Sequence, residues 1–156
     1  MLRLTKESIE EIKRQAREGY PLECGGFLAV PVPIRYRASS PQADGKEITA
    51  VYPMKNLNSH QPRIRFEIDP KEFQRLEAEA TKDGLQLLVF YHTHPDSPLK
   101  TNPSAFDRER AEGLSTFWPD LSYLIVSVDK GKEFQLASWV FNPAQGGFEE
   151  EEIEVV

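Results

Sequence analysis

The sequence predicts an α/β or α+β fold in which a mixed β-sheet carries about three helices. Three segments have helix-start signals or helical periodicity, and they are interleaved with about seven short runs rich in β-branched and aromatic residues. The run at 85–93 is apolar almost throughout, which is typical of a strand covered on both faces. At 156 residues the chain is long enough for one proper core, so a single domain over 1–156 is expected.

The first third of the chain is expected to form one helix followed by strands. Apolar residues recur on one helical face of 5–18, with Thr5 as a candidate N-cap and Gly19 placed to stop the helix. Strands are predicted at 26–30, 47–54 and 64–68, and a turn or mobile loop at 35–46. The strand at 64–68 is predicted because apolar and polar residues alternate there.

The remaining elements begin with a well-marked helix. Asp69 is suited to the N-cap and Pro70 to the first helical position, and Gly84 is placed to end this helix. Beyond it the sequence predicts strands at 85–93, 121–128, 133–141 and 148–155, and a short helix at about 103–115.

Composition excludes several classes of function. The net charge of −6 argues against a nucleic-acid partner, which favours a basic face. No apolar run approaches the ~20 residues of a membrane span, and the N-terminus lacks the apolar core of a signal peptide. The single cysteine gives no disulfide framework and fits a reducing compartment, so a cytoplasmic location without membrane contact is expected.

The most informative residues are His92 and His94, which end the apolar run. Two residues apart on a strand, they project from the same face and can reach one ion. Asp107, at the start of the next predicted helix, supplies a third ligand. Two imidazoles and one carboxylate form the open ligand set of a catalytic zinc, whereas either histidine alone would more often be a buried, hydrogen-bonded residue.

Ser104 and Asp107 also have a structural interpretation, because serine followed three residues later by an acid resembles a capping box. However, Asn102 and Pro103 offer a better helix start, with asparagine as N-cap and proline at the first position. We therefore predict that Ser104 and Asp107 lie inside the first turn and face the site.

Glu23 precedes an apolar strand, where an isolated glutamate is usually a solvated loop charge. Hydrolysis beside a metal needs a general base, and few other candidates lie near the ends of apolar strands. Among other polar residues, His60 is expected at the surface, Cys24 as inert packing, and the run 149–152 as a solvated strand face.

The combined motif resembles the JAMM/MPN-plus metallopeptidase family. The residues that carry the resemblance are Glu23, His92-Thr93-His94-Pro95 and Ser104-Ala105-Phe106-Asp107. The resemblance implies one zinc ion bound by His92, His94 and Asp107, with Glu23 transferring the proton and Ser104 steadying the water and the developing oxyanion. It further implies hydrolysis after the C-terminal Gly-Gly of a ubiquitin-like protein, which for small prokaryotic-type members is a sulfur carrier.

The chain departs from the family pattern in the segment between His94 and Ser104, which is two residues longer than usual. We expect this long loop and the proline-bearing segment 31–33 to flank the site. The main alternative function is a catalytically silent module of the same fold that binds a ubiquitin-like partner. An amidohydrolase barrel needs ~250 residues, and a zinc deaminase needs a Pro-Cys-x-x-Cys motif, so the chain fits neither class.

Overall fold

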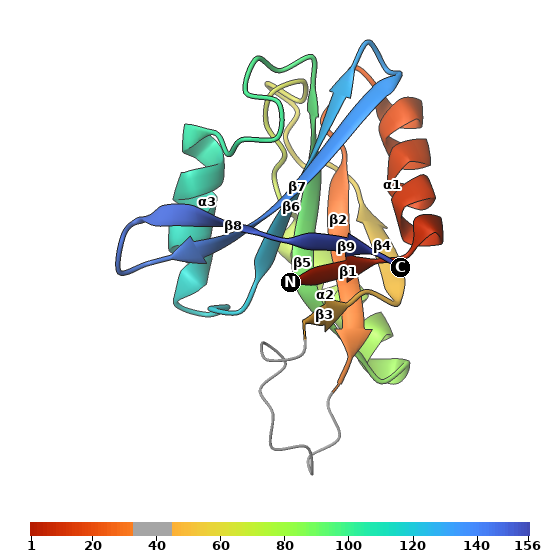
Figure 1. The fold of residues 1–156 in the computed structure, drawn as a ribbon, viewed down its shortest axis with the longest axis vertical. Coiled ribbons are helices and arrows are strands. Elements are labelled where there is room, and N and C mark those ends of the chain that lie inside the picture. Colours follow the sequence, from red (N-terminus) through yellow and green to blue (C-terminus); the bar gives the residue numbers. More distant parts are fainter. Residues whose placement is uncertain (33–44) are drawn as a thin grey trace.

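A six-stranded mixed sheet organises the fold, in the strand order β4-β2-β5-β6-β7-β8 (Figure 1). The computed structural model describes residues 1–32 and 45–156. The strands of this sheet are β2 (Gly25–Pro31), β4 (Ala50–Met54), β5 (Leu85–Pro95), β6 (Ser122–Asp129), β7 (Glu133–Asn142) and β8 (Gly147–Glu151). Strands β5 and β6 pair in parallel, and the other neighbours are antiparallel. The sheet is therefore mixed, as predicted.

A second, smaller sheet brings the two ends of the described chain together. It consists of β3 (Lys46–Glu47), β1 (Leu2–Leu4) and β9 (Ile153–Val155), in that order and all parallel. Leu2 pairs with Ile153 and Leu4 with Val155, so the N- and C-terminal segments lie side by side. Leu2 and Leu4 are fully buried, which makes this small sheet part of the core.

Three helices are present in the described residues, and their starts follow from capping chemistry. They are α1 (Lys6–Gly19), α2 (Pro70–Lys82) and α3 (Ala105–Ser115). The Thr5 side chain accepts a hydrogen bond from the backbone N–H of Ser8, and that of Asp69 accepts one from Lys71. These two N-caps confirm the predicted starts of α1 and α2. Among the described helices, none is long and apolar enough to cross a membrane.

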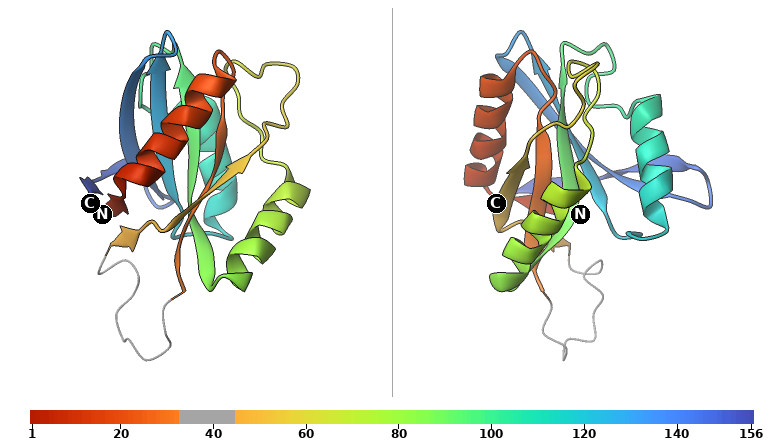
Figure 2. Two further views of the ribbon diagram at one scale, coloured as in Figure 1. Left: turned by 90° about the vertical axis from the view of Figure 1, so that its right-hand side faces the viewer. Right: turned by 180° about the vertical axis from the view of Figure 1, so that it is seen from behind.

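The helices cover both faces of the large sheet (Figure 2). Helix α1 and the small sheet lie on one face, and α2 and α3 lie on the other. Two hydrophobic clusters follow from this arrangement, because side chains alternate along β5: Phe90 joins the cluster under α2 and α3, whereas Val89 and Tyr91 join the cluster under α1. The predicted fold, about three helices packed on a mixed sheet, is confirmed and is of the α+β class.

The predicted strand at 64–68 is wrong, since no strand forms there. Ile64 is 66% exposed and Phe66 is fully buried, so the alternation reflects individual contacts rather than a pleated ladder. The Asn56 side chain takes the place of a neighbouring strand: its amide donates to Arg65 O, and its carbonyl accepts from Glu67 N. Backbone groups are thus satisfied by one side chain, which no local pattern reports.

Three further expectations need correction or fall outside the described part. The single strand expected at 47–54 is divided between β3 and β4, and that expected at 148–155 is divided between β8 and β9, which lie in different sheets. Strand β1 was not predicted, because a three-residue strand depends on its distant partners. The turn or mobile loop expected at 35–46 falls mainly on residues 33–44, which lie outside the described residues.

The run 149–152 is not simply a solvated face, because Glu151 is drawn into a buried polar cluster. Its carboxylate, 8% exposed, accepts hydrogen bonds from the hydroxyls of Ser122 at 2.6 Å and Ser138 at 3.0 Å. The Lys46 ammonium donates to the same Ser122 hydroxyl at 2.6 Å. This cluster joins β3 of the small sheet to three strands of the large one and satisfies each buried polar group.

Candidate metal centre

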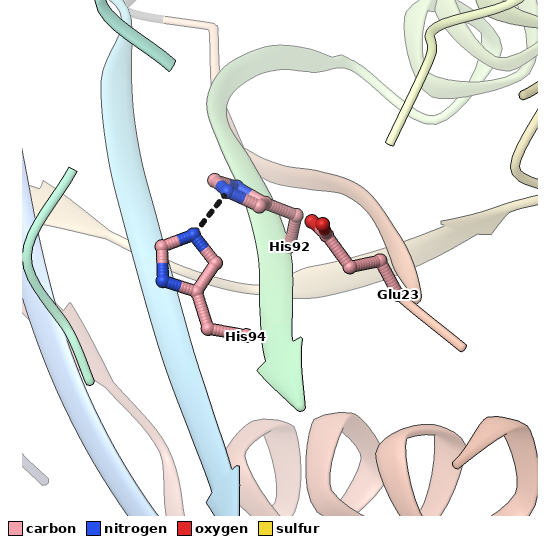
Figure 3. A group of neighbouring side chains, drawn as sticks. All are labelled: Glu23, His92 and His94. Atoms are coloured by element: carbon pink, nitrogen blue, oxygen red, sulfur yellow. Dashed lines mark hydrogen bonds between the residues drawn. The ribbon is translucent and has the colours of Figure 1, made fainter. Parts of the chain in front are cut away.

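His92 and His94 lie near the C-terminal end of β5 and face the side of the sheet covered by α3. The preceding residue on that face, Phe90, stacks on the His92 ring at a centroid distance of 5.3 Å. Both imidazoles are buried, and their Nε2 atoms are 3.1 Å apart (Figure 3). The strand period of two therefore brings the two rings together, as the sequence predicts.

Asp107 meets both imidazoles from the first turn of α3. Its Oδ1 lies 3.0 Å from His92 Nε2, and its Oδ2 lies 3.2 Å from His94 Nε2. Burial raises the pKa of this carboxyl, but the two imidazoles outweigh burial and hold the pKa far below its usual range. Asp107 is therefore ionised and brings a full negative charge between two ring nitrogens.

The surroundings fix which nitrogen of His94 can act as a ligand. Its Nδ1 lies 2.8 Å from the backbone oxygen of Lys100. A carbonyl only accepts hydrogen bonds, so Nδ1 carries a proton and Nε2 is the nitrogen that can present a lone pair to a metal ion. Burial lowers the pKa of His92 to about 4 and leaves this ring neutral near pH 7. Burial alone would lower the pKa of His94, but the hydrogen bond and negative charge of Asp107, together with the Lys100 carbonyl and the Glu23 charge, outweigh burial and raise that pKa.

The three groups fit a tetrahedral zinc ion. Ligand atoms ~2.0–2.1 Å from zinc in a tetrahedron are ~3.3–3.4 Å from one another. The separations of 3.0–3.2 Å among His92 Nε2, His94 Nε2 and the Asp107 carboxylate are close to that spacing. We call these three groups, His92 Nε2, His94 Nε2 and the Asp107 carboxylate, the ligand triangle. A second carboxylate, that of Glu23, lies beside its two histidines.

Glu23 offers its carboxylate within 4.8 Å of the ligand atoms of both histidines. Figure 3 shows it reaching toward the imidazoles from the segment just before β2. The position follows from sheet register, since Gly25 pairs with His92 and so places Glu23 beside the end of β5. Its backbone N–H donates to Pro62 O at 2.7 Å.

The environment of Glu23 suits proton transfer rather than solvation. The side chain is buried, against the default expectation for a loop glutamate. Burial raises its pKa to about 8, although the nearby His94 and Arg110 act to lower it. A carboxylate with a pKa near the working pH can both accept and return a proton. Glu23, His92 and His94 together form a buried group that can hold a metal ion.

Ser104 is the N-cap of α3, which corrects the predicted helix start at Asn102 and Pro103. Its hydroxyl accepts from the N–H of Asp107 at 3.0 Å, and Asp107 Oδ2 accepts from the N–H of Ser104 at 2.8 Å. This is a complete capping box. Asp107 Oδ2 also faces His94, so the capping role and the site role coexist instead of excluding each other.

A cavity of about 300 Å³ opens beside these residues. Its lining includes Glu23, His94 and Ser104, together with the exposed side chains Ile64 and Leu99. The long loop after Pro95 contributes to the wall, as expected. The expectation for the segment 31–33 is wrong, because Pro31 pairs with Leu85 at the opposite end of β5; Pro33 lies outside the described residues.

Arg110 is a part of the site that was not predicted from the sequence. Its guanidinium is nearly buried, lies 3.4 Å from Asp107 Oδ1, and donates to Phe66 O. The group sits 4.8 Å from the ring centroid of Phe90 and 5.0 Å from that of Phe106, within range of a cation–π contact. The only signal in the sequence is its i,i+3 spacing from Asp107 on α3.

The other two residues singled out from the sequence lie apart from this chemistry. His60 is exposed. Cys24 is a free, half-buried thiol whose Sγ lies 3.6 Å from Gln15 O, and burial raises its pKa.

Helices on both faces of a mixed sheet, with two imidazoles and two carboxylates buried at the end of a central strand, define a candidate metal-binding domain. The chain belongs to the family described as prokaryotic homologs of the JAB domain, which matches residues 5–142. The resemblance to JAMM/MPN-type proteins inferred from the motif is thereby confirmed.

Individual relatives agree with this assignment. The chain is 35% identical over 133 residues to the desampylase of Haloferax volcanii, covering 82% of this chain and 81% of the relative. A solution structure of a protein from Desulfitobacterium hafniense is similar with a TM-score of 0.79 and 31% identity, covering 100% of this chain and 93% of that one. A solution structure of a protein from Salinibacter ruber is similar with a TM-score of 0.67 and 29% identity, covering 98% of this chain and 90% of that one.

Proposed function

We propose that this chain is a zinc-dependent peptidase or isopeptidase that hydrolyses the bond after the C-terminal Gly-Gly of a ubiquitin-like protein of the sulfur-carrier type. The observation that carries the proposal is the convergence of His92, His94 and Asp107 next to a small cavity that His94, Glu23 and Ser104 line. The similarity to a desampylase supports hydrolysis as the outcome.

His92 Nε2, His94 Nε2 and the Asp107 carboxylate would hold the zinc ion. When bound, zinc supplies Lewis acidity that polarises a carbonyl and makes water a nucleophile near neutral pH. The capping box keeps Asp107 in place, because one of its oxygens accepts from the Ser104 N–H while both face the imidazoles. Arg110 adds a positive charge at the other oxygen.

Glu23 accepts a proton from the attacking water and passes it to the leaving nitrogen. A buried carboxylate beside the ligand triangle suits both halves of this transfer. Ser104 lines the same cavity, so its hydroxyl can donate to the oxygen that gains negative charge during attack. While it donates in this way, the hydroxyl oxygen keeps accepting from Asp107 N–H.

The shape of the cavity supports a slender substrate tail. Two exposed apolar side chains, Ile64 and Leu99, are in its wall, and the volume of about 300 Å³ leaves little room beside Glu23 and His94. Glycine has no side chain, so a Gly-Gly segment lets its backbone approach the buried groups without a clash. We therefore expect the cleaved bond to follow two glycines.

The direct test uses a ubiquitin-like carrier whose Gly-Gly end is extended by a short peptide. Incubated with zinc-loaded protein and followed by mass spectrometry, this carrier should lose the extension and end in a free glycine carboxylate. A carrier with leucines in place of the two glycines should be cleaved at least ~10²-fold more slowly, since misplacing the scissile bond by ~1 Å costs that much. Equal cleavage of both carriers would contradict the proposed specificity.

Ser104→Ala should impair both folding and turnover, because the residue has two roles. Loss of the N-cap should cost ~1 kcal/mol, or ~2–4 °C in melting temperature. Loss of the oxyanion donor should lower kcat by ~10²–10³-fold. The matched control is Thr5→Ala, which removes the N-cap of α1 and leaves the cavity intact. If both variants lose the same stability and neither loses activity, Ser104 serves only as a cap.

A further inference from the structure

The loop from Asp96 to Pro103 is held to the rest of the molecule at several points. At its start, Asp96 N–H donates to Val128 O at 2.9 Å, and the Asp96 carboxylate accepts from Lys130 N–H at 2.7 Å. The Tyr20 hydroxyl, just beyond α1, donates to the same carboxylate. This end of the loop is thus bound both to the β6–β7 turn and to the end of α1.

The second half of the loop is held by the same hairpin. The Lys100 ammonium lies 2.6 Å from the carboxylate of Asp129, the last residue of β6. The indole N–H of Trp139, on β7, donates to Thr101 O at 2.9 Å. Two side chains from one hairpin therefore hold two successive residues of the loop.

The group between these anchors is the Lys100 carbonyl, which accepts from His94 Nδ1 at 2.8 Å. The Lys100 backbone has φ +55°, in the left-handed region that side chains other than glycine seldom adopt. Such a conformation persists only where surrounding contacts impose it. The ion pair of its own side chain and the hydrogen bond to the next carbonyl are the contacts in place to do so.

We propose that Asp129 and Trp139 are positioning residues for the metal centre. By holding Lys100 and Thr101, they keep the Lys100 carbonyl on His94 Nδ1 and so keep the His94 ring turned with Nε2 toward the candidate metal site. The long loop and the β6–β7 hairpin thus act as one brace for the second histidine. The inference rests on the metal site of the proposed function and concerns metal affinity, whatever substrate is cleaved.

The test measures zinc affinity rather than activity. The variant Asp129→Asn/Trp139→Phe removes one charge and one indole N–H, while asparagine keeps the shape of Asp129 and phenylalanine keeps an aromatic ring at position 139. Loss of a partner that orients a metal ligand typically weakens binding ~10–100-fold, so we expect the zinc dissociation constant to rise by ~10-fold or more. Competition with a chromophoric chelator measures that constant, and circular dichroism of the metal-free protein checks that it remains folded.

Two further variants make the result specific. Asp129→Glu keeps a carboxylate for Lys100 and should bind zinc nearly as tightly as the parent. Arg75→Gln/Trp118→Phe removes an exposed ion-pairing arginine of α2 and the other tryptophan, which packs against Phe27 and Phe73. This control should leave zinc affinity unchanged.

The inference is overturned if the Asp129→Asn/Trp139→Phe protein binds zinc within twofold of the parent, if the control loses as much affinity, or if the parent binds no zinc. Carrier cleavage by the parent is scored separately. If the parent cleaves the carrier and the variant binds zinc as tightly as the parent, only the positioning role of Asp129 and Trp139 is rejected. If the variant binds zinc more weakly and the parent does not cleave the carrier, only the peptidase assignment is rejected.

Discussion

His94→Ala should empty the metal centre or leave it loosely filled, and should abolish turnover. In the proposed site, His94 is one of three groups whose atoms lie 3.0–3.2 Å apart, and its removal leaves only His92 and Asp107 at that spacing. Neither remaining group can replace the missing bond, because both are fixed by the strand and the capping box. Elemental analysis of the purified variant measures the zinc bound per chain.

The matched control for this prediction is His60→Ala. His60 is exposed and belongs to an irregular segment outside the ligand triangle, so its loss should leave about one zinc per chain. Full zinc content in His94→Ala would show that this histidine is not a ligand, whatever its effect on activity.

The Glu23→Gln variant should retain bound zinc and the native fold, but its turnover number should fall by ~10²–10⁴-fold. The amide preserves the shape of the side chain yet cannot accept the proton of the attacking water, and general-base catalysis typically contributes a factor of that size. Steady-state cleavage of the extended carrier, measured together with zinc content, tests both halves of the expectation. Glu67→Gln, a change at an exposed glutamate, is the control.

This variant also decides between two donor sets. The atoms of Glu23, His92 and His94 lie close enough to form a metal group of their own, and Asp107 gives the tighter set with the same histidines. If Glu23 were a ligand, Glu23→Gln would lose zinc along with activity. Activity within a few fold of the parent would remove Glu23 from the mechanism.

The sequence was sufficient for the part of the site that local geometry determines. The spacing of His92 and His94 on an apolar strand fixes their common face, and the turn of α3 brings Asp107 to them. Glu23 could not be assigned from its own neighbourhood, because its burial depends on pairing between β2 and β5, strands about 60 residues apart in the chain. The family resemblance supplied what local reasoning lacked.

The errors in the prediction have related physical causes. From the sequence, a capping role of Ser104 and Asp107 stands against a functional one, but each carboxylate oxygen has more than one lone pair and can serve both roles. Apolar and polar residues alternate in the segment 64–68 as in a strand, yet the Asn56 side chain, not a neighbouring strand, forms hydrogen bonds with the Arg65 carbonyl and the Glu67 N–H. The local sequence predicts a solvated Glu151, because it does not show that β3 places Lys46 on the Ser122 hydroxyl that donates to the Glu151 carboxylate.

Activity titrated with zinc is the most direct test of the account. Metal-stripped protein should be inactive on the extended carrier, recover in proportion to added zinc, and reach a plateau at about one zinc per chain. His94→Ala, titrated in parallel, should remain inactive at that ratio. Full cleavage by the stripped protein, or equal recovery by parent and His94→Ala, would contradict a metal-dependent peptidase at this site.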